Sequence, residues 1–248
     1  MSQVSRQVAR RSAPPRRRTA RRRAATTEAI VERIATAIAE HRLPPGTKLG
    51  EEALGEIFGV SRTKARQALH RLATDKLVTL LPHRGAFVAQ PTVLEAREVF
   101  EARRVLEPAV VARFVDVATP DQIETLLEHH AREQAAIATN DARAAQRLLG
   151  WFHVLIAEMA GNRVLADVLR ELVMRSSLIT LLYQTTADSR RSSEEHRELI
   201  AHIEKREVEQ AVELATRHLE RVEAGLALRE PSSEVVDLKS ALAAAGAG

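Results

Sequence analysis

The architecture of the first third of this chain follows from one run, Gly59-Val60-Ser61-Arg62-Thr63-Lys64-Ala65-Arg66-Gln67-Ala68-Leu69. Glycine 59 ends a short helix expected over residues 51–58, in which Leu54 and Ile57 are expected to face inward. Ser61 is placed to cap a third helix that runs to about residue 74, with alanines and leucines as its inward stripe. A helix, a tight glycine turn and a capped helix together form the helix-turn-helix pattern.

The segments on either side of this run complete a small domain. Isoleucines recur at helical spacing from residue 28, and the turn 43–46, with two prolines and a glycine, ends that first helix. After the third helix, two short strands are expected over 77–80 and 86–89, joined through residues 82–85. The sequence therefore predicts a winged helix-turn-helix domain with a small β wing over residues 25–90.

The polar side chains of the third helix occur where a DNA-reading helix needs them. A recognition helix contacts base edges with its N-terminal residues, and arginine pairs with guanine through two hydrogen bonds. The candidates in its first two turns are Arg62, Thr63, Lys64, Arg66 and Gln67. Arg84, at the tip of the wing, is placed to reach a phosphate or the adjacent minor groove. The alternative is a solvated, charged helix face.

This segment resembles the GntR family of bacterial transcription regulators. The residues that carry the resemblance are Leu43-Pro44-Pro45-Gly46-Thr47-Lys48-Leu49, Leu54, Gly59-Val60-Ser61-Arg62-Thr63, Arg66, Ala68-Leu69, Arg71-Leu72 and Arg84-Gly85. The resemblance implies DNA contacts from Arg62, Thr63 and Arg66 and, in the wing, from Arg84 and Gly85. Lys64 and Gln67 replace the family's common proline and glutamate, which leaves the operator sequence open.

Charge is distributed unevenly along the 248 residues. Residues 1–24 contain nine arginines and no acidic residue, whereas residues 95–228 contain seventeen basic and twenty-three acidic side chains. We expect 1–24 to be a disordered tail that adds non-specific phosphate contacts, or simply a solvated tail; it also resembles an organelle transit peptide.

The absence of cysteine excludes disulfide frameworks, and no apolar run is long enough for a membrane-spanning helix, so we expect a cytoplasmic protein.

Every element expected in the second part of the chain is helical. Residues 95–226 predict an all-α bundle of six or seven helices, and 227–248 a flexible tail. Ser192 and Glu195 have the spacing of a capping box at the start of one of these helices. The expected fold is therefore mainly α, with the winged domain followed by a helical bundle.

Three histidines on separate predicted helices have apolar residues at helical spacing beside them: His153, His196 and His218. A single histidine on such a face is usually a packed core residue. Three together are also able to bind a metal ion, because imidazole is the commonest metal ligand and a three-histidine site leaves a coordination position open. Both interpretations stay open at this point.

The bundle looks like the FadR-type C-terminal domain of GntR regulators, an effector-binding and dimerisation domain. The matching residues are Glu101, Arg103, Leu106-Glu107, Phe152-His153, Gly161-Asn162, Glu195-His196-Arg197 and His218-Leu219. Many members bind a divalent metal through the three histidines and an aspartate four residues before the first, but here that position is Leu149. The resemblance leaves two readings: Zn²⁺ or Ni²⁺ on three imidazoles, completed by an effector carboxylate or water, or a metal-free site that binds an anionic effector with Arg103.

The leading hypothesis is a homodimeric transcription regulator, a repressor of an inverted-repeat operator, controlled by a small carboxylate metabolite and not an enzyme. A metal-dependent hydrolase is the alternative, because three histidines are able to activate water. Its only candidate general base is Glu195, which is adjacent to His196 and so does not share its helix face. A third possibility is a protein that coats nucleic acid through the arginine tail.

Overall fold

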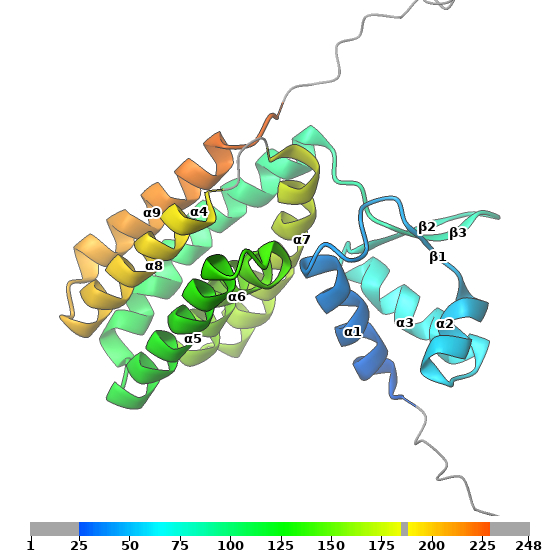
Figure 1. The fold of residues 1–248 in the computed structure, drawn as a ribbon, viewed down its shortest axis with the longest axis horizontal. Helices are drawn as coiled ribbons and strands as arrows, with labels where there is room; N and C mark the ends of the chain where they lie inside the picture. Colours follow the sequence, from blue (N-terminus) through cyan, green and yellow to red (C-terminus); the bar gives the residue numbers. More distant parts are fainter. Residues whose placement is uncertain (1–24, 185–187, 229–248) are drawn as a thin grey trace, which may run out of the picture.

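The computed structural model describes residues 25–184 and 188–228, which form an N-terminal part with a small sheet and a C-terminal helical bundle, joined by the short segment 89–92 (Figure 1). The elements of the N-terminal part are α1 (Thr27–Ala39), β1 (Lys48–Leu49), α2 (Glu51–Phe58), α3 (Arg62–Thr74), β2 (Val78–Leu81) and β3 (Gly85–Val88). The C-terminal part contains α4 (Val93–Val117), α5 (Pro120–Ala138), α6 (Ala142–Met159), α7 (Arg163–Tyr183), α8 (Ser189–Glu204) and α9 (Val208–Ala224). The prediction of a winged helix-turn-helix followed by a helical bundle is confirmed.

The turn between α2 and α3 has the chemistry that the sequence predicts. Gly59 adopts a left-handed conformation with φ of 65°, and the Val60 amide donates to the carbonyl of Gly55 at 2.9 Å. A β-carbon on Gly55 would lie 3.0 Å from the Val60 carbonyl oxygen, so the turn packs too closely for a side chain there. The Ser61 hydroxyl accepts from the Lys64 amide at 3.3 Å and starts α3.

The wing is a three-stranded antiparallel sheet in the order β1-β3-β2. Lys48 pairs with Phe87 across β1 and β3, and Val78 pairs with Val88 across β2 and β3. The strands β2 and β3 start within one residue of the predicted positions. The two-residue β1 was not predicted, because so short a segment carries no alternating pattern.

The bundle begins with well-capped helices. Thr92 and Thr119 form capping boxes at the starts of α4 and α5, and Asn162 caps α7. Six helices form this part among the described residues. Its core is aliphatic and aromatic, centred on fully buried Phe114 and Phe152.

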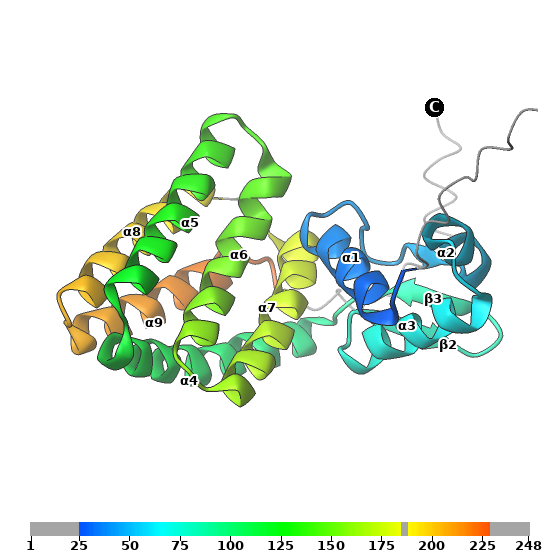
Figure 2. The same cartoon turned by 90° about the horizontal axis from the view of Figure 1, so that it is seen from below.

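Helix α7 belongs to both parts of the molecule. Figure 2 shows α7 between the rest of the bundle and α1. Met174 and Leu178 of α7 are buried in the same hydrophobic cluster as the core of the winged domain. Arg147 of α6 also forms an ion pair with Glu40, at the end of α1, at 2.8 Å. The winged domain is therefore packed directly on the bundle.

Two local predictions were wrong. Ile57 is 65% exposed, whereas Leu54 is buried as expected, so α2 buries a narrower face than its pattern indicated. Ser192 does not cap α8, because that helix begins earlier, at Ser189, and is capped by the carboxylate of Asp188, which accepts from the Arg191 amide. The predictions for the tail at 1–24 and for residues 229–248 lie outside the described residues.

Candidate functional site

The outer face of α3 carries the predicted DNA-reading residues. Arg62, Thr63, Arg66 and Gln67 are all exposed in its first two turns, while the opposite face is buried against the winged-domain core. The buried stripe consists of Ala65, Ala68, Leu69 and Leu72. The structure therefore presents four of the five predicted helix residues to solvent. They lie in the N-terminal turns, the part of a recognition helix that enters the major groove.

The two arginines on α3 share one carboxylate. The guanidinium of Arg66 donates to both oxygens of Glu51 at 2.7 and 2.9 Å, and Arg62 Nε donates to Glu51 Oε2 at 2.7 Å. The hydrogen bonds from Arg66 and then Arg62 lower the pKa of the Glu51 carboxyl to about 2. Sequence reasoning did not identify Glu51, because it lies eleven residues before Arg62, on α2.

Lys64 is placed differently from its neighbours. It is half-buried, and its ammonium donates to the carbonyl of Ala25 at 3.0 Å, next to the start of α1. Its side chain is thus engaged in holding α1 against α3, in contrast to the exposed guanidiniums of Arg62 and Arg66.

The wing residues lie at the turn between β2 and β3. His83 and Gly85 have positive φ values of 59° and 97°, which form the tight turn, and Arg84 between them is exposed. The Arg84 guanidinium carbon lies 5.9 Å from the centre of the Phe87 ring, within the range of a cation–π contact. Arg84 therefore projects from the wing tip, as predicted from the sequence.

The three predicted histidines meet inside the bundle. His153 comes from α6, His196 from α8 and His218 from α9, and one nitrogen of each lies within 4.8 Å of the others. His196 is 1% exposed, and its Nε2 has no hydrogen-bond partner among the described residues. A buried nitrogen without a partner is unfavourable unless a ligand completes it.

Each of these imidazoles is held on its other side by a glutamate. The Nδ1 atoms of His153, His196 and His218 lie 2.9, 3.0 and 2.7 Å from the carboxylates of Glu107, Glu133 and Glu195, respectively. An ionised carboxylate only accepts hydrogen bonds, so each Nδ1 carries the proton and each Nε2 keeps its lone pair. Carboxylate–histidine pairs of this kind orient metal ligands in proteins.

Burial controls the protonation of the cluster. It lowers the pKa of all three imidazoles, for His218 to about 4 against the opposing hydrogen bond to Glu195. Burial by itself raises the pKa of Glu133, but His196 and His129 outweigh it and lower that pKa to about 2. At neutral pH the cluster therefore consists of neutral imidazoles and ionised carboxylates.

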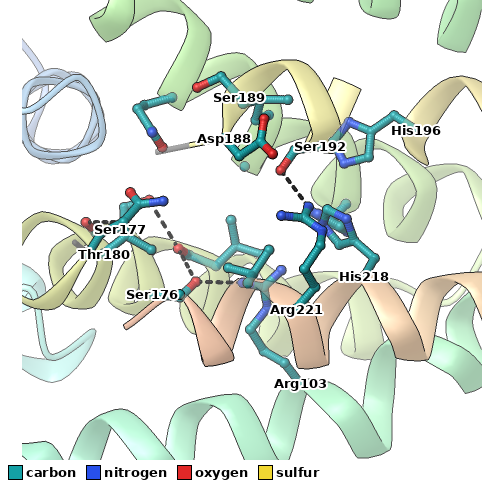
Figure 3. Close-up of a pocket in the computed structure, with 18 of the residues that line it drawn as sticks. Arg103, Ser176, Ser177, Thr180, Asp188, Ser189, Ser192, His196, His218 and Arg221 are labelled. Carbon is teal, nitrogen blue, oxygen red and sulfur yellow. Dashed lines mark hydrogen bonds between the residues drawn. The ribbon is translucent and has the colours of Figure 1, made fainter. Parts of the chain in front are cut away.

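Two arginines flank the histidines. Arg103 Nε donates to Glu107 at 2.5 Å and its Nη1 to Ser176 at 2.9 Å, while Arg221 donates to Glu195 and, at 2.9 Å, to Ser192 (Figure 3). Arg103 thus joins the histidines, as predicted. Arg221 was missed, although it follows His218 by three residues and so shares its helix face.

A cavity of about 380 Å³ opens beside the histidines and both arginines. Polar side chains from α6, α7 and the start of α8 contribute to its wall, and several of them are labelled in Figure 3. These polar residues are Gln146, Ser176, Ser177, Thr180, Gln184, Asp188, Ser189 and Ser192. Leu149, one turn before His153, also lines the cavity and supplies no oxygen ligand. The cavity has the size and mixed lining of a small-molecule site.

None of the three glutamates beside the histidines is placed to act as a general base for hydrolysis. Glu195, the candidate base, accepts from His218, Arg191 and Arg221, so its oxygens are engaged in positioning those groups. Glu107 and Glu133 are likewise engaged behind the imidazoles, on the side away from Nε2. The arrangement suits binding better than water activation.

Both parts of the chain match known families. Residues 26–88 match the family described as bacterial regulatory proteins, gntR family, and residues 98–221 match the FCD domain. The HTH-type transcriptional repressor RspR of Escherichia coli is 23% identical over 181 residues, which cover 73% of this chain and 79% of that protein. An HTH-type transcriptional regulator of Agrobacterium vitis is 31% identical over 126 residues, covering 50% of this chain and 70% of the relative.

A solved structure shows the same fold. Escherichia coli McbR/YncC superposes with a TM-score of 0.73 at 22% identity, and the match covers 80% of this chain and 95% of that one. The families and relatives indicate a regulator of transcription, and the hydrolase alternative finds no support among them. In the described residues, no helix combines the length and apolar character needed to cross a membrane.

Proposed function

This chain belongs to the GntR family of bacterial regulatory proteins, as a DNA-binding transcription regulator with an FCD domain, and from that premise we propose that a small carboxylate bound beside its three histidines controls its affinity for an operator. The observation that carries the proposal is Nε2 of buried His196, which has no hydrogen-bond partner in the described part of the chain and lies near its two histidine neighbours, next to the cavity.

We infer that the histidines bind a divalent cation, Zn²⁺ or Ni²⁺. Glu107 and Glu195 each pair with an arginine, but Glu133, which is 0% exposed, forms ion pairs only with His129 and His196 among the described side chains. A buried carboxylate needs compensating positive charge, and a cation at Nε2 of His196 would provide it through the ring. Three nitrogen ligands without a carboxylate at Leu149 leave room for an effector oxygen. When bound, the cation would act as a Lewis acid that attracts this oxygen.

The residues around the histidines favour a hydroxylated carboxylate as effector. Arg103 and Arg221 keep guanidinium N–H groups beyond those donated to the glutamates and serines, and these suit a carboxylate. The hydroxyls of Ser177 and Thr180 donate to helix carbonyls, so their oxygens remain able to accept from a ligand hydroxyl. A purely aliphatic acid would leave these acceptor positions unused.

Helix α7 provides a physical connection between effector and DNA. Ser176 receives a hydrogen bond from Arg103 at the cavity, while Met174 and Leu178, on the same helix, pack in the winged-domain core. A ligand that alters the Arg103–Ser176 contact therefore acts on the helix that seats the winged domain. An effector changes operator affinity only if it binds the two arrangements of the domains unequally, and this contact is where the difference would arise.

We propose that α3 reads DNA through Arg62, Thr63, Arg66 and Gln67, with Arg84 and Gly85 contacting the backbone or minor groove from the wing. A homodimer would place two such helices on an inverted repeat. Repression is the direction we propose, in line with the relative named as a repressor. A protein that acts on the bacterial chromosome works in the cytoplasm, and that is the location we propose.

The DNA part is tested by selecting bound duplexes from a random library and measuring dissociation constants for the selected and a scrambled sequence at fixed salt. We expect Arg66→Ala to reduce discrimination between the two by tenfold or more, because a bidentate arginine–guanine pair contributes about 1–3 kcal/mol. Arg71→Ala is the matched control, since Arg71 is exposed at the other end of α3. Failure of the wild type to enrich any sequence would contradict the proposal.

The effector part is tested by elemental analysis of the purified protein, followed by thermal unfolding with a panel of acids. The panel pairs aliphatic and polyhydroxylated carboxylates of equal chain length, each with Zn²⁺, Ni²⁺ or EDTA. We expect hydroxylated acids to raise the unfolding midpoint more than their aliphatic counterparts, and His196→Ala to abolish the effect. Equal shifts in wild type and His196→Ala would place acid binding elsewhere.

A further inference from the structure

The two arginines on the outer face of α3 are held by a residue outside that helix. Glu51, the first residue of α2, accepts from Nε of both Arg62 and Arg66, at 2.7 Å in each case, and from Arg66 Nη2 at 2.9 Å. A single carboxylate thus fixes both guanidiniums across the turn of the helix-turn-helix motif. The family resemblance quoted above does not include position 51.

The contacts use the inner edges of the guanidiniums. Within the described part of the chain, the Nη1 and Nη2 atoms of Arg62 and Nη1 of Arg66 make no other hydrogen bond. The arginine side chains are 72% and 54% exposed, whereas that of Glu51 is 23% exposed. The carboxylate therefore lies beneath the arginines, and their donor-rich ends point away from it, toward solvent.

We propose that Glu51 is a positioning residue of the DNA-reading surface. By bonding the inner edges of Arg62 and Arg66, it orders their outer N–H groups for hydrogen bonds to a base edge before DNA binds. The inference rests on the proposed function of α3. Ordering long side chains in advance reduces the conformational entropy lost on binding, and so favours the sequence to which their geometry is complementary.

The opposite role for a carboxylate near DNA-binding arginines would be to mask them, by occupying the N–H groups that contact DNA. Two features favour positioning. Glu51 bonds the inner edges and leaves the outer ones free, whereas a mask would cover the donors that face DNA. Glu51 also stays ionised at neutral pH, since the arginine hydrogen bonds lower its pKa to about 2. The charged contact is therefore present under the conditions in which DNA binding is measured.

The test compares Glu51→Gln with Glu56→Gln, using the selected and scrambled duplexes defined above. Glu56 is exposed on the same helix and makes no side-chain hydrogen bond or ion pair within the described residues, so both variants remove one negative charge from α2. We expect both to bind scrambled DNA slightly more tightly, because one repulsion with phosphate is lost. Only Glu51→Gln is expected to lose discrimination, by about tenfold, because arginine pairing with the cognate bases is disturbed.

Glu51→Asp separates geometry from charge. It keeps the negative charge but withdraws the carboxylate by one methylene, so we expect wild-type affinity for scrambled DNA and a several-fold loss of discrimination. In an Arg66→Ala background, the effect of Glu51→Gln should shrink, since the partner through which it acts is gone. Discrimination at the wild-type level in both Glu51 variants would overturn the inference, as would tighter and more selective binding by Glu51→Gln. If the wild type itself enriches no sequence, the proposed function fails instead.

Discussion

The outer face of α3 and the histidine cluster of the bundle use the same local arrangement in opposite surroundings. In both, a glutamate bonds one edge of a nitrogen-rich group and leaves the other edge available: Glu51 beneath Arg62 and Arg66, and Glu133 behind His196. The arginine side chains are more than half exposed, whereas Glu133 is 0% exposed and His196 1%. Exposure therefore decides what each arrangement contributes.

On the surface, water and salt screen the ion pairs, so their contribution to stability is small and their main effect is on geometry. In the bundle, removal of one partner leaves a buried polar group unpaired, which destabilises the fold strongly. We therefore propose that equivalent contacts serve DNA selectivity in one region, and both stability and ligand binding in the other. The expected effects on stability differ accordingly between the two regions.

The largest effect is expected from Glu133→Ala in the metal-free protein. The change leaves the Nδ1–H group of His196 without an acceptor and opens a cavity, and we expect the free energy of unfolding to fall by about 3–5 kcal/mol. Urea denaturation in EDTA measures it. Glu128→Gln, at an exposed position on the same helix, is the control and should change stability by less than about 0.5 kcal/mol. Equal effects of the two variants would refute the contrast between buried and exposed carboxylates.

Metal binding is the next in size. A divalent ion at one hundred times its dissociation constant should increase the free energy of unfolding by about 2.7 kcal/mol, if it binds the folded state alone. We expect this gain with Zn²⁺ or Ni²⁺ in the wild type, its reversal by EDTA, and its absence in His196→Ala. His70→Ala, which removes an exposed histidine of α3, should keep the full gain. A gain that survives in His196→Ala would mean that the ion binds elsewhere.

Acidification should distinguish the two regions further. The unfolded chain protonates His218 near its ordinary pKa of 6.5, but in the folded protein burial lowers that pKa to about 4. Its contribution to stability is therefore complete above pH 6.5 and lost as the pH falls toward 4, by at most about 1.4 kcal/mol per pH unit. His153 and His196 change in the same direction.

Unfolding of the metal-free protein in urea at pH 7, 6 and 5 measures this slope. We expect it to be smaller in His218→Asn and unaltered in Glu51→Gln, because the carboxyl of Glu51 titrates below this range. A slope as steep in His218→Asn as in the wild type would show that the histidine cluster does not set the acid sensitivity.

The smallest effect is the stability of Glu51→Gln itself. Since the pairs that it removes are largely exposed, the free energy of unfolding at pH 7 should change by no more than about 0.5 kcal/mol, even where discrimination between DNA sequences falls. Chemical denaturation measured alongside DNA binding checks this separation. A loss of several kcal/mol would mean that Glu51 acts mainly on folding.

Local patterns in the sequence were sufficient for most elements and for the histidines, whose positions follow from helical spacing. They failed where another part of the chain decides the outcome. Ser192 and Glu195 have the spacing of a capping box, yet Asp188 caps the helix, and Glu195 pairs with His218, 23 residues away. Glu133 lies 63 residues from His196, so no local spacing reveals their pairing. Tertiary packing alone brings these carboxylates to the imidazoles.

If a ligand in the cavity beside the histidines controls DNA binding, as we propose, it must change the affinity for the operator, and a titration measures this change. The dissociation constant for the selected duplex is measured by fluorescence anisotropy, with and without the panel acid that stabilises the protein most, in wild type and in His196→Ala. We expect a change of fivefold or more in the wild type and none in the variant. An unchanged dissociation constant in the wild type, or an equal change in both proteins, would contradict it.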